Sequence, residues 1–176
     1  DVAVAHGNFG LRGTESDADA QFVEAFCAAQ NLRFFTTKFD TQAYRQDAKV
    51  SMQMAARELR YAWFTELLQQ HDLDYILTAH HADDNLETFL INLSRGTGID
   101  GLAGIPAEHG KVIRPLLVFS REDIASYAAA QQLTWREDSS NASDAYLRNQ
   151  IRHHIVPALK AMKPEFLSSF LDNIAA

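Results

Sequence analysis

Cysteine is almost absent from the sequence: Cys27 is the only one in 176 residues. A disulfide framework and a cysteine-based zinc site are therefore excluded. Long hydrophobic runs are also missing, since no uninterrupted apolar stretch approaches the roughly 20 residues that cross a bilayer, and the first residues show no signal-peptide pattern. We expect a protein of the reducing cytoplasm with no membrane segment.

An excess of basic residues is missing as well, because the net charge is -7. Such a chain does not coat nucleic acid without specificity. The charge is uneven, however, since residues 145–164 contain basic residues and no acidic one. One interpretation is that this segment binds phosphate groups. The alternative is that it is a helix whose basic residues favour its C-terminal half. Its members are Arg148, Arg152, His153, His154, Lys160 and Lys163.

Short β-rich runs alternate with helical patterns along the first half of the chain. Apolar residues recur with helical spacing in residues 17–30 and 48–70. Runs of β-branched, aromatic and aliphatic residues predict strands at 2–6, 32–39 and 74–80. This order predicts an α/β fold of Rossmann-like type: a parallel twisted sheet with helices on both faces, followed by a helical C-terminal segment.

Ligands of such sheets bind beyond the carboxyl ends of the strands. Three loops are expected in that crevice, and they read "HGNFGLRG" (6–13), "DTQAYRQD" (40–47) and "HHADDN" (80–85). Function should therefore be sought in these loops.

The helix predicted at residues 82–94 carries acids away from its apolar stripe. Asp84 and Glu87 lie on the opposite side, together with Ile91. Three interpretations stay open: acids favoured by the helix dipole, metal ligands together with neighbouring histidines, or active-site groups that hold an ammonium and accept its proton. The stripe consists of Leu86, Phe89, Leu90 and Leu93, and the histidines are His6, His80 and His81.

Further along the chain, the glycines of "GTGIDGLAGIP" (96–106) favour a closely approaching backbone. A short extended segment is expected at 111–119. Ser120 and Asp123 then form a capping-box pattern that opens a helix ending near Gln132. A polar loop follows, and the basic helix begins near Tyr146.

Five stretches resemble the tRNA(Ile)-lysidine synthases, which are N-type ATP pyrophosphatases. "HHADDNLET" and "NLSRGTGIDGLAGI" match the family patterns HHxxDxxET and RGxGxxGLxG. The matches run in order from Ala5 to Leu159, and their register makes the resemblance specific. The other three are "AHGNFGLRGTESDADAQF", "AARELRY" and "REDSSNASDAYLRNQIRHHIVPAL".

The resemblance implies a fold of the adenine nucleotide alpha hydrolase type and a two-step reaction. ATP, with Mg²⁺, adenylates the C2 oxygen of the wobble cytidine in a tRNA(Ile) that has a CAU anticodon, and pyrophosphate is released. The ε-amine of L-lysine then attacks C2, and AMP leaves. The partners implied are this tRNA and L-lysine, and a homodimer is left open.

The resemblance also implies roles for individual residues. Asp84 and Glu87 would hold the ammonium and accept its proton, with Asp84 as the first choice of base. Arg148 and Arg152 would bind the adenylated intermediate or tRNA phosphates, the alternative being salt bridges to residues 136–138. No metal ligand is assigned. The expected nucleotide-binding residues are Ala5, His6, His80, His81, Arg95, Gly96 and Gly98, and the expected RNA-binding residues are Arg12, Arg57, Arg60 and Lys160.

The sequence departs from the family pattern in three places. Phe9 stands where the family has histidine, which leaves the role of that histidine in doubt. The family's SGGxDS nucleotide loop would precede Asp1, and its C-terminal domains would follow the last residue. We therefore expect a catalytic fragment with an α/β domain at 1–144 and a helical extension at 145–176.

Three alternatives remain. A related tRNA thiolase is disfavoured because such enzymes carry several cysteines. A metal-dependent phosphoesterase would use "HHADD" and would hydrolyse its substrate without lysine. A non-catalytic tRNA-binding fragment would bind with a steep salt dependence.

We expect the isolated 176-residue chain not to turn over ATP, because the resemblance places its main pyrophosphate cradle in the SGGxDS loop. A pyrophosphate-release assay on the purified chain tests this, and turnover would contradict it.

Overall fold

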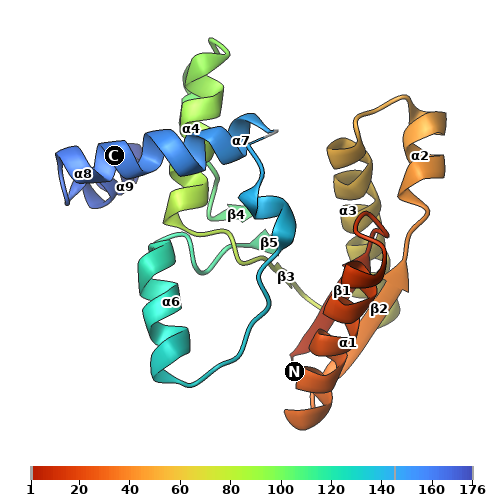
Figure 1. Ribbon diagram of the computed structural model, residues 1–176. Helices are drawn as coiled ribbons and strands as arrows, with labels where there is room; N and C mark the ends of the chain where they lie inside the picture. Colours follow the sequence, from red (N-terminus) through yellow and green to blue (C-terminus); the bar gives the residue numbers. More distant parts are fainter. Residues whose placement is uncertain (1, 145, 176) are drawn as a thin grey trace. The chain divides into compact units, whose positions relative to one another are not determined.

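The structure, a computed structural model, describes residues 2–144 and 146–175, with the backbone alone at 99, 100, 140, 142 and 175. The chain divides into two compact units, Asp1–Asp74 and Tyr75–Ala176. Figure 1 labels the helices and strands of both units.

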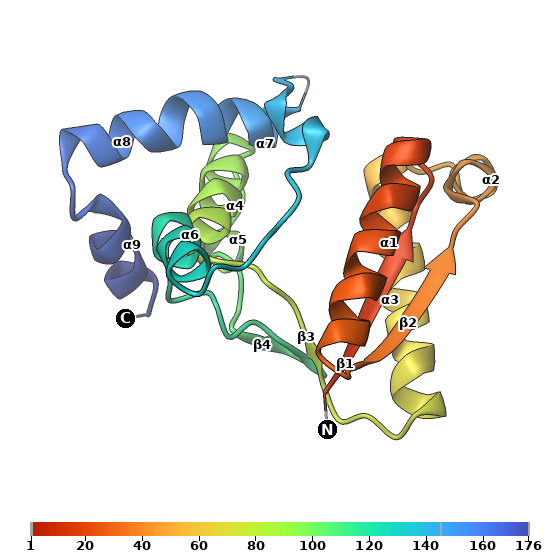
Figure 2. The same cartoon turned by 60° about the horizontal axis from the view of Figure 1, so that its bottom comes forward.

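The first unit is a parallel β-pair with helices on both faces. Strand β1 (Ala3–Asn8) pairs with β2 (Arg33–Lys38), with Ala3 opposite Arg33 and Asn8 opposite Lys38. Helix α1 (Thr14–Ala29) connects the strands and packs on one face of the pair, and α3 (Met52–Gln70) lies on the other (Figure 2). This arrangement confirms the predicted β-α-β order.

The segment after β2 was predicted to be a loop, and that prediction was wrong. Residues 41–48 form helix α2 (Thr41–Ala48), whose first turn is capped by Asp40 through a 2.9 Å hydrogen bond from Ala43 N. Lys49 then adopts a left-handed conformation with φ 55°. Because Ser51 caps the next helix, the predicted helix 48–70 begins only at Met52.

The second unit contains a small mixed sheet. Strand β3 (Ile76–Leu77) pairs in parallel with β5 (Val112–Ile113), and β4 (Glu108–His109) pairs antiparallel with β5. The predicted strand 74–80 is thus paired over two residues only. Together with β1 and β2, these parallel pairs confirm the predicted α/β fold class.

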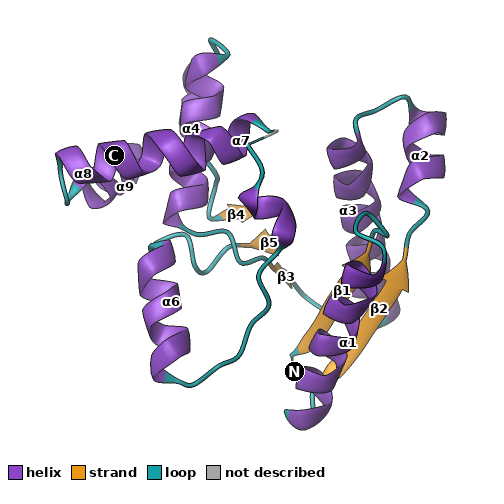
Figure 3. Ribbon diagram, viewed as in Figure 1, coloured by secondary structure: helices purple, strands orange, loops and turns teal. Residues whose placement is uncertain are grey.

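Most of the second unit is helical. A long loop that contains the turn η1 (Ser139–Ala142) joins α6 to α7 (Figure 3). The segments α7, η2 and α8 follow one another directly and form a single helical run, whose middle part, η2, is a π-helix. The helices are α4 (Ala82–Ser94), α5 (Ile99–Leu102), α6 (Arg121–Ala130), α7 (Leu147–Gln150), η2 (Ile151–Ile155), α8 (Val156–Met162) and α9 (Phe166–Ala175).

The core of the second unit forms where α4 meets the C-terminal helices. Leu86 is 1% exposed and belongs to the predicted stripe, but Leu93 is 53% exposed, so its predicted place in the stripe was wrong. Ile91, expected on the opposite side, is buried because the helices from α7 onward cover that side of α4. The core residues are Ala82, Leu86, Ile91, Ile151, Val156, Leu167 and Phe170.

The helical extension predicted at 145–176 therefore shares its core with α4, and the domain division at residue 144 stays a prediction. None of the helices in the described part of the chain is both long enough and apolar enough to cross a membrane.

Candidate active site

The N-terminus of α4 is fixed by His81 and Asp84. His81 Nδ1 accepts a hydrogen bond from Asp84 N (3.3 Å), and Asp84 Oδ2 accepts one from His81 N (3.1 Å). This reciprocal capping box satisfies two amide groups that a helix start leaves unpaired. The "HHADD" segment thus begins a helix and aims the Asp84 carboxylate from its first turn. The capping box predicted at Ser120 and Asp123 is also present.

Glu87 lies one turn further along α4 and is almost completely buried, at 1% exposure. Arg152 holds both of its oxygens, with Nε 2.6 Å from Oε1 and Nη2 3.0 Å from Oε2. The same Nη2 lies 3.2 Å from Asp84 Oδ1. A carboxylate that is removed from water needs hydrogen-bond donors, and the guanidinium fork of Arg152 supplies them to both oxygens of Glu87.

Arg148 joins the same cluster from the preceding turn of the helical run. Its Nη1 lies 3.4 Å from Glu87 Oε2, and its Nη2 donates a 2.9 Å hydrogen bond to Thr88 Oγ1. The Arg148 side chain is 41% exposed, whereas that of Arg152 is 20% exposed. Arg148 is therefore the arginine that a ligand can reach.

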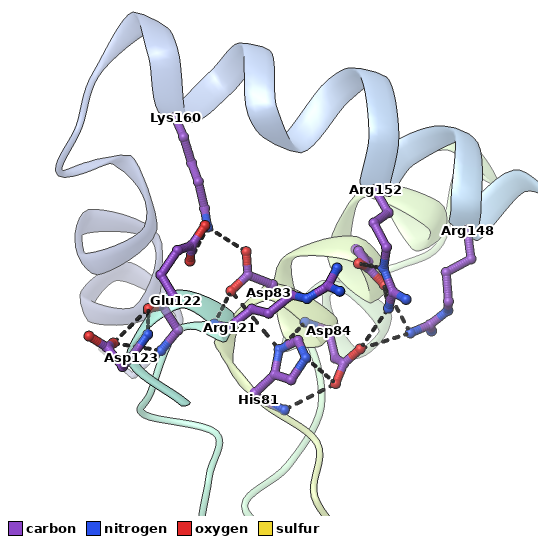
Figure 4. A network of polar contacts seen from close by, with 11 residues as sticks. His81, Asp83, Asp84, Arg121, Glu122, Asp123, Arg148, Arg152 and Lys160 are labelled. Atoms are coloured by element: carbon purple, nitrogen blue, oxygen red, sulfur yellow. Dashed lines mark hydrogen bonds and ion pairs between the residues drawn. The ribbon is translucent and has the colours of Figure 1, made fainter. Parts of the chain in front are cut away.

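The structure thus brings together all four residues predicted to be catalytic, and Figure 4 shows Arg148 and Arg152 pointing from one helical run toward Asp84. We call Asp84, Glu87, Arg148 and Arg152 the charge cluster. Hydrogen bonding to Glu87 raises the pKa of Arg152 against the effect of burial, and the nearby Asp84 and Asp83 carboxylates add to it. The cluster therefore joins two guanidinium groups to two carboxylates.

The glycine-rich segment after α4 is anchored by two asparagines that the sequence analysis did not single out. Asn85 is 3% exposed, and its Oδ1 accepts a 2.6 Å hydrogen bond from Ile105 N. Asn92 Nδ2 donates a 2.7 Å bond to Gly101 O. Gly104 has φ 73°, and a Cβ there would overlap the Asn85 side chain. Both asparagines lie inside the matched motifs, and that position is the signal that could have identified them.

The predicted nucleotide-binding residues fall into two groups. Ala5 and His6 lie on β1 in the first unit, where burial is the main cause that lowers the pKa of His6. The second unit holds the others. There His80 Nδ1 lies 2.9 Å from Thr78 Oγ1, and Arg95 ends α4 just before Gly96, which has φ 71°. The second group is His80, His81, Arg95, Gly96 and Gly98. The convergence of both groups on one nucleotide stays a prediction.

The predicted RNA-binding arginines all lie in the first unit. Arg12 pairs with Asp19 at 2.6 Å. Arg57 lies over the Tyr61 ring at 4.8 Å, and Arg60 lies over the Phe9 ring at 5.0 Å. Phe9 also stacks on Phe39. The residue that replaces the family's histidine therefore supports Arg60 by a cation–π contact, and RNA binding by these arginines stays a prediction.

The basic segment pairs largely with acids of the same unit. His153 Nδ1 and His154 Nε2 both bond the Asp144 carboxylate, at 2.6 and 2.7 Å. Lys160 Nζ lies 2.5 Å from Asp83 Oδ1 and 2.9 Å from Glu122 Oε2. Among the described residues, no group of three or more His, Cys, Asp or Glu side chains could hold a metal ion.

Asp83 provides a pH-dependent test of the α4 N-terminus. Burial opposes ionisation, but hydrogen bonds from Lys160 Nζ and Arg121 N outweigh it, so the pKa of Asp83 lies below its ordinary value of 3.8. A lowered folded-state pKa stabilises the fold above the unfolded value and loses that effect as pH falls through the folded one. We expect Asp83→Asn to lower the free energy of unfolding by a constant amount between about pH 5 and 8.

The difference between the variant and the wild type should close below pH 3.8, as measured by urea unfolding over a pH series. Asp172→Asn, which changes an exposed residue of α9, is the matched control and should show no difference. A difference for Asp83→Asn that persists at about pH 2 would contradict this assignment.

The sequence matches a family model of the PP-loop domain over residues 1–159. The tRNA(Ile)-lysidine synthase of Porphyromonas gingivalis strain W83 is 45% identical over 172 residues, which cover 97% of this chain and 38% of that protein. The one from Chlorobaculum tepidum is 45% identical over 174 residues, covering 99% and 53%. The one from Bacillus subtilis is 40% identical over 173 residues, covering 96% and 37%. These identities confirm the resemblance seen in the motifs.

The chain spans from 37% to 53% of the length of these three relatives. Among solved structures, the U34-tRNA thiolase NcsA from Methanococcus maripaludis with its 4Fe-4S cluster has a TM-score of 0.74 and 14% identity, covering 97% of this chain and 60% of that one. This likeness concerns the fold alone. Because the family model matches nearly the whole chain, the chain belongs to the PP-loop family.

Proposed function

We propose that this chain is the catalytic part of a tRNA(Ile)-lysidine synthase. The observation that carries the proposal is the charge cluster. Two of the five matched stretches meet there, one with Asp84 and Glu87 and the other with Arg148 and Arg152. The names of the relatives supply the substrate, a tRNA(Ile), and membership of the PP-loop family supports ATP as the co-substrate. L-lysine as second substrate, a cytoplasmic location and a homodimer belong to the same proposal.

Asp84 is the acid best placed to receive the lysine ammonium. Its side chain is 15% exposed, against 1% for Glu87. Only its Oδ1 lies against an arginine, at 3.2 Å from Arg152 Nη2, and its Oδ2 contacts His81, whereas both oxygens of Glu87 are held by arginines. A carboxylate attracts the ammonium and accepts one of its protons, which leaves an amine with a free electron pair.

The amine nitrogen then forms a bond to C2 of the adenylated cytidine. The bond from C2 to the adenylated oxygen breaks, AMP leaves with that oxygen and the bonding electrons, and the nitrogen gives a second proton to water. Asp84 is the proton acceptor of the first transfer.

The arginines would act on the phosphate of the adenylate. Arg148 is exposed enough to give one guanidinium edge to phosphate oxygens, and a planar fork suits that geometry. Glu87 holds Arg152 and contacts Arg148, so we assign it the positioning of both groups.

Magnesium would neutralise phosphate charge in this reaction. Among the described residues, no group of three or more His, Cys, Asp or Glu side chains is arranged to hold a metal ion. We therefore route no step through the metal. The thiolase alternative gains no support beyond the fold, because Cys27 is buried and is the only cysteine of the sequence.

The test is ATP-dependent incorporation of labelled lysine into a tRNA(Ile) transcript with a CAU anticodon, using the full-length protein. Asp84→Asn keeps the size of the side chain and an oxygen that can accept the His81 N–H bond, but it removes the base. We expect the rate to fall by at least about 100-fold.

Asp172→Asn is the matched control and should label tRNA at the wild-type rate. Absence of labelling by a folded wild-type protein would overturn the proposed function. Unchanged labelling by Asp84→Asn would overturn the role of Asp84 alone.

A further inference from the structure

Lys160 lies at the junction of three helices in the second unit. Its ammonium on α8 lies 2.5 Å from Asp83 Oδ1 on α4 and 2.9 and 3.0 Å from the two carboxylate oxygens of Glu122 on α6 (Figure 4). Asp83 Oδ2 in turn accepts a 2.9 Å bond from Arg121 N, in the first turn of α6. One lysine and one aspartate therefore connect α4, α6 and α8.

This contact is shielded from water on the Asp83 side. The Asp83 side chain is 9% exposed and that of Lys160 is 21% exposed. Burial works against the charge on Lys160, but hydrogen bonds to Asp83 and Glu122 outweigh it and raise the pKa of the ammonium. An ammonium has three N–H donors, and three carboxylate oxygens surround this one. The ammonium is thus directed toward carboxylates of its own unit.

The pair stands next to the charge cluster on both helices. Asp83 immediately precedes Asp84 on α4, and Lys160 follows Arg152 by eight residues on one helical run. Eight residues of a regular α-helix span about 12 Å and turn about 80° beyond two full turns. The π-helix η2 begins just before Arg152 and winds less per residue, so it brings Lys160 and Arg152 to the same side, facing α4.

The helical run meets α4 through the arginines of the charge cluster, through the apolar core around Ile151 and Val156, and through the pair of Lys160 and Asp83. That pair is a second polar contact, two turns beyond Arg152, and it restricts rotation and sliding of the run there. The second contact therefore sets where both guanidinium groups of the cluster lie.

We infer that Lys160 is a positioning residue, which through Asp83 sets the geometry of the charge cluster for the lysine-transfer step and does not bind RNA. The inference rests on the proposed function for its kinetic consequence, and it replaces the RNA-binding role that the sequence suggested for Lys160.

The kinetic test uses the full-length protein with tRNA(Ile), ATP and L-lysine. With Lys160→Met we expect kcat/KM for L-lysine to fall by about 10- to 100-fold, because small misplacements of reacting groups have effects of that size. The Kd for tRNA and its salt dependence should stay unchanged. Lys160→Arg keeps a cation between the two carboxylates and should restore most of the loss. Lys111→Met, at an exposed lysine of the same unit, is the matched control.

Amide hydrogen exchange in the same proteins gives a readout that does not need activity. Lys160→Met should speed exchange in residues 82–87 and 147–152 and leave β1 and β2 unchanged, since those strands belong to the other unit. A merely destabilised protein would speed exchange throughout and would lower the amount of active enzyme without changing KM for lysine.

Two results would overturn the inference. One is a weaker Kd for tRNA and a salt slope smaller by about 1, with kcat/KM for lysine unchanged, which would mark Lys160 as a phosphate contact. The other is unchanged exchange in residues 82–87 of Lys160→Met. If the wild type fails to transfer lysine, the proposed function fails, while hydrogen exchange still decides whether Lys160 positions the cluster.

Discussion

The second unit depends on one buried acid. Glu87 is enclosed between α4 and the helical run from α7 to α8, and its buried carboxylate is satisfied there by Arg152, which meets both of its oxygens, and by Arg148. The pair joins the run to α4, and the apolar residues around Leu86 and Ile151 pack in the same interface. The same pairing places Arg148 and Asp84 beside each other, so packing and candidate chemistry share one constraint.

The sequence predicted those features that repeat locally. Apolar periodicity identified α1, α3 and α4, and the pattern at Ser120 identified the start of α6. Helix α2 was missed because Thr41–Ala48 is short, contains few apolar residues, and begins at a cap by Asp40. The burial of Ile91 was missed because it depends on helices more than 50 residues further along the chain.

The sequence indicated which residues form the candidate site but not which of them contact each other. The motifs indicated Asp84, Glu87, Arg148 and Arg152, yet the contacts join residues 61 to 68 positions apart. Local spacing carries no information on such contacts, so the pairing of Glu87 with Arg152 was not predicted. The basic residues at 145–164 suggested a phosphate-binding segment, because their acidic partners Asp83 and Glu122 lie elsewhere in the sequence.

The most direct measurement is a double-mutant cycle between Glu87 and Arg152. Free energies of unfolding would be measured for Glu87→Gln, Arg152→Met and the combination, at one pH and salt concentration. If the pair holds the helical run on α4, the effects should be non-additive, with a coupling of about 1 to 3 kcal/mol. Effects that add to within about 0.5 kcal/mol would show that the two side chains do not depend on each other, and would contradict the central claim.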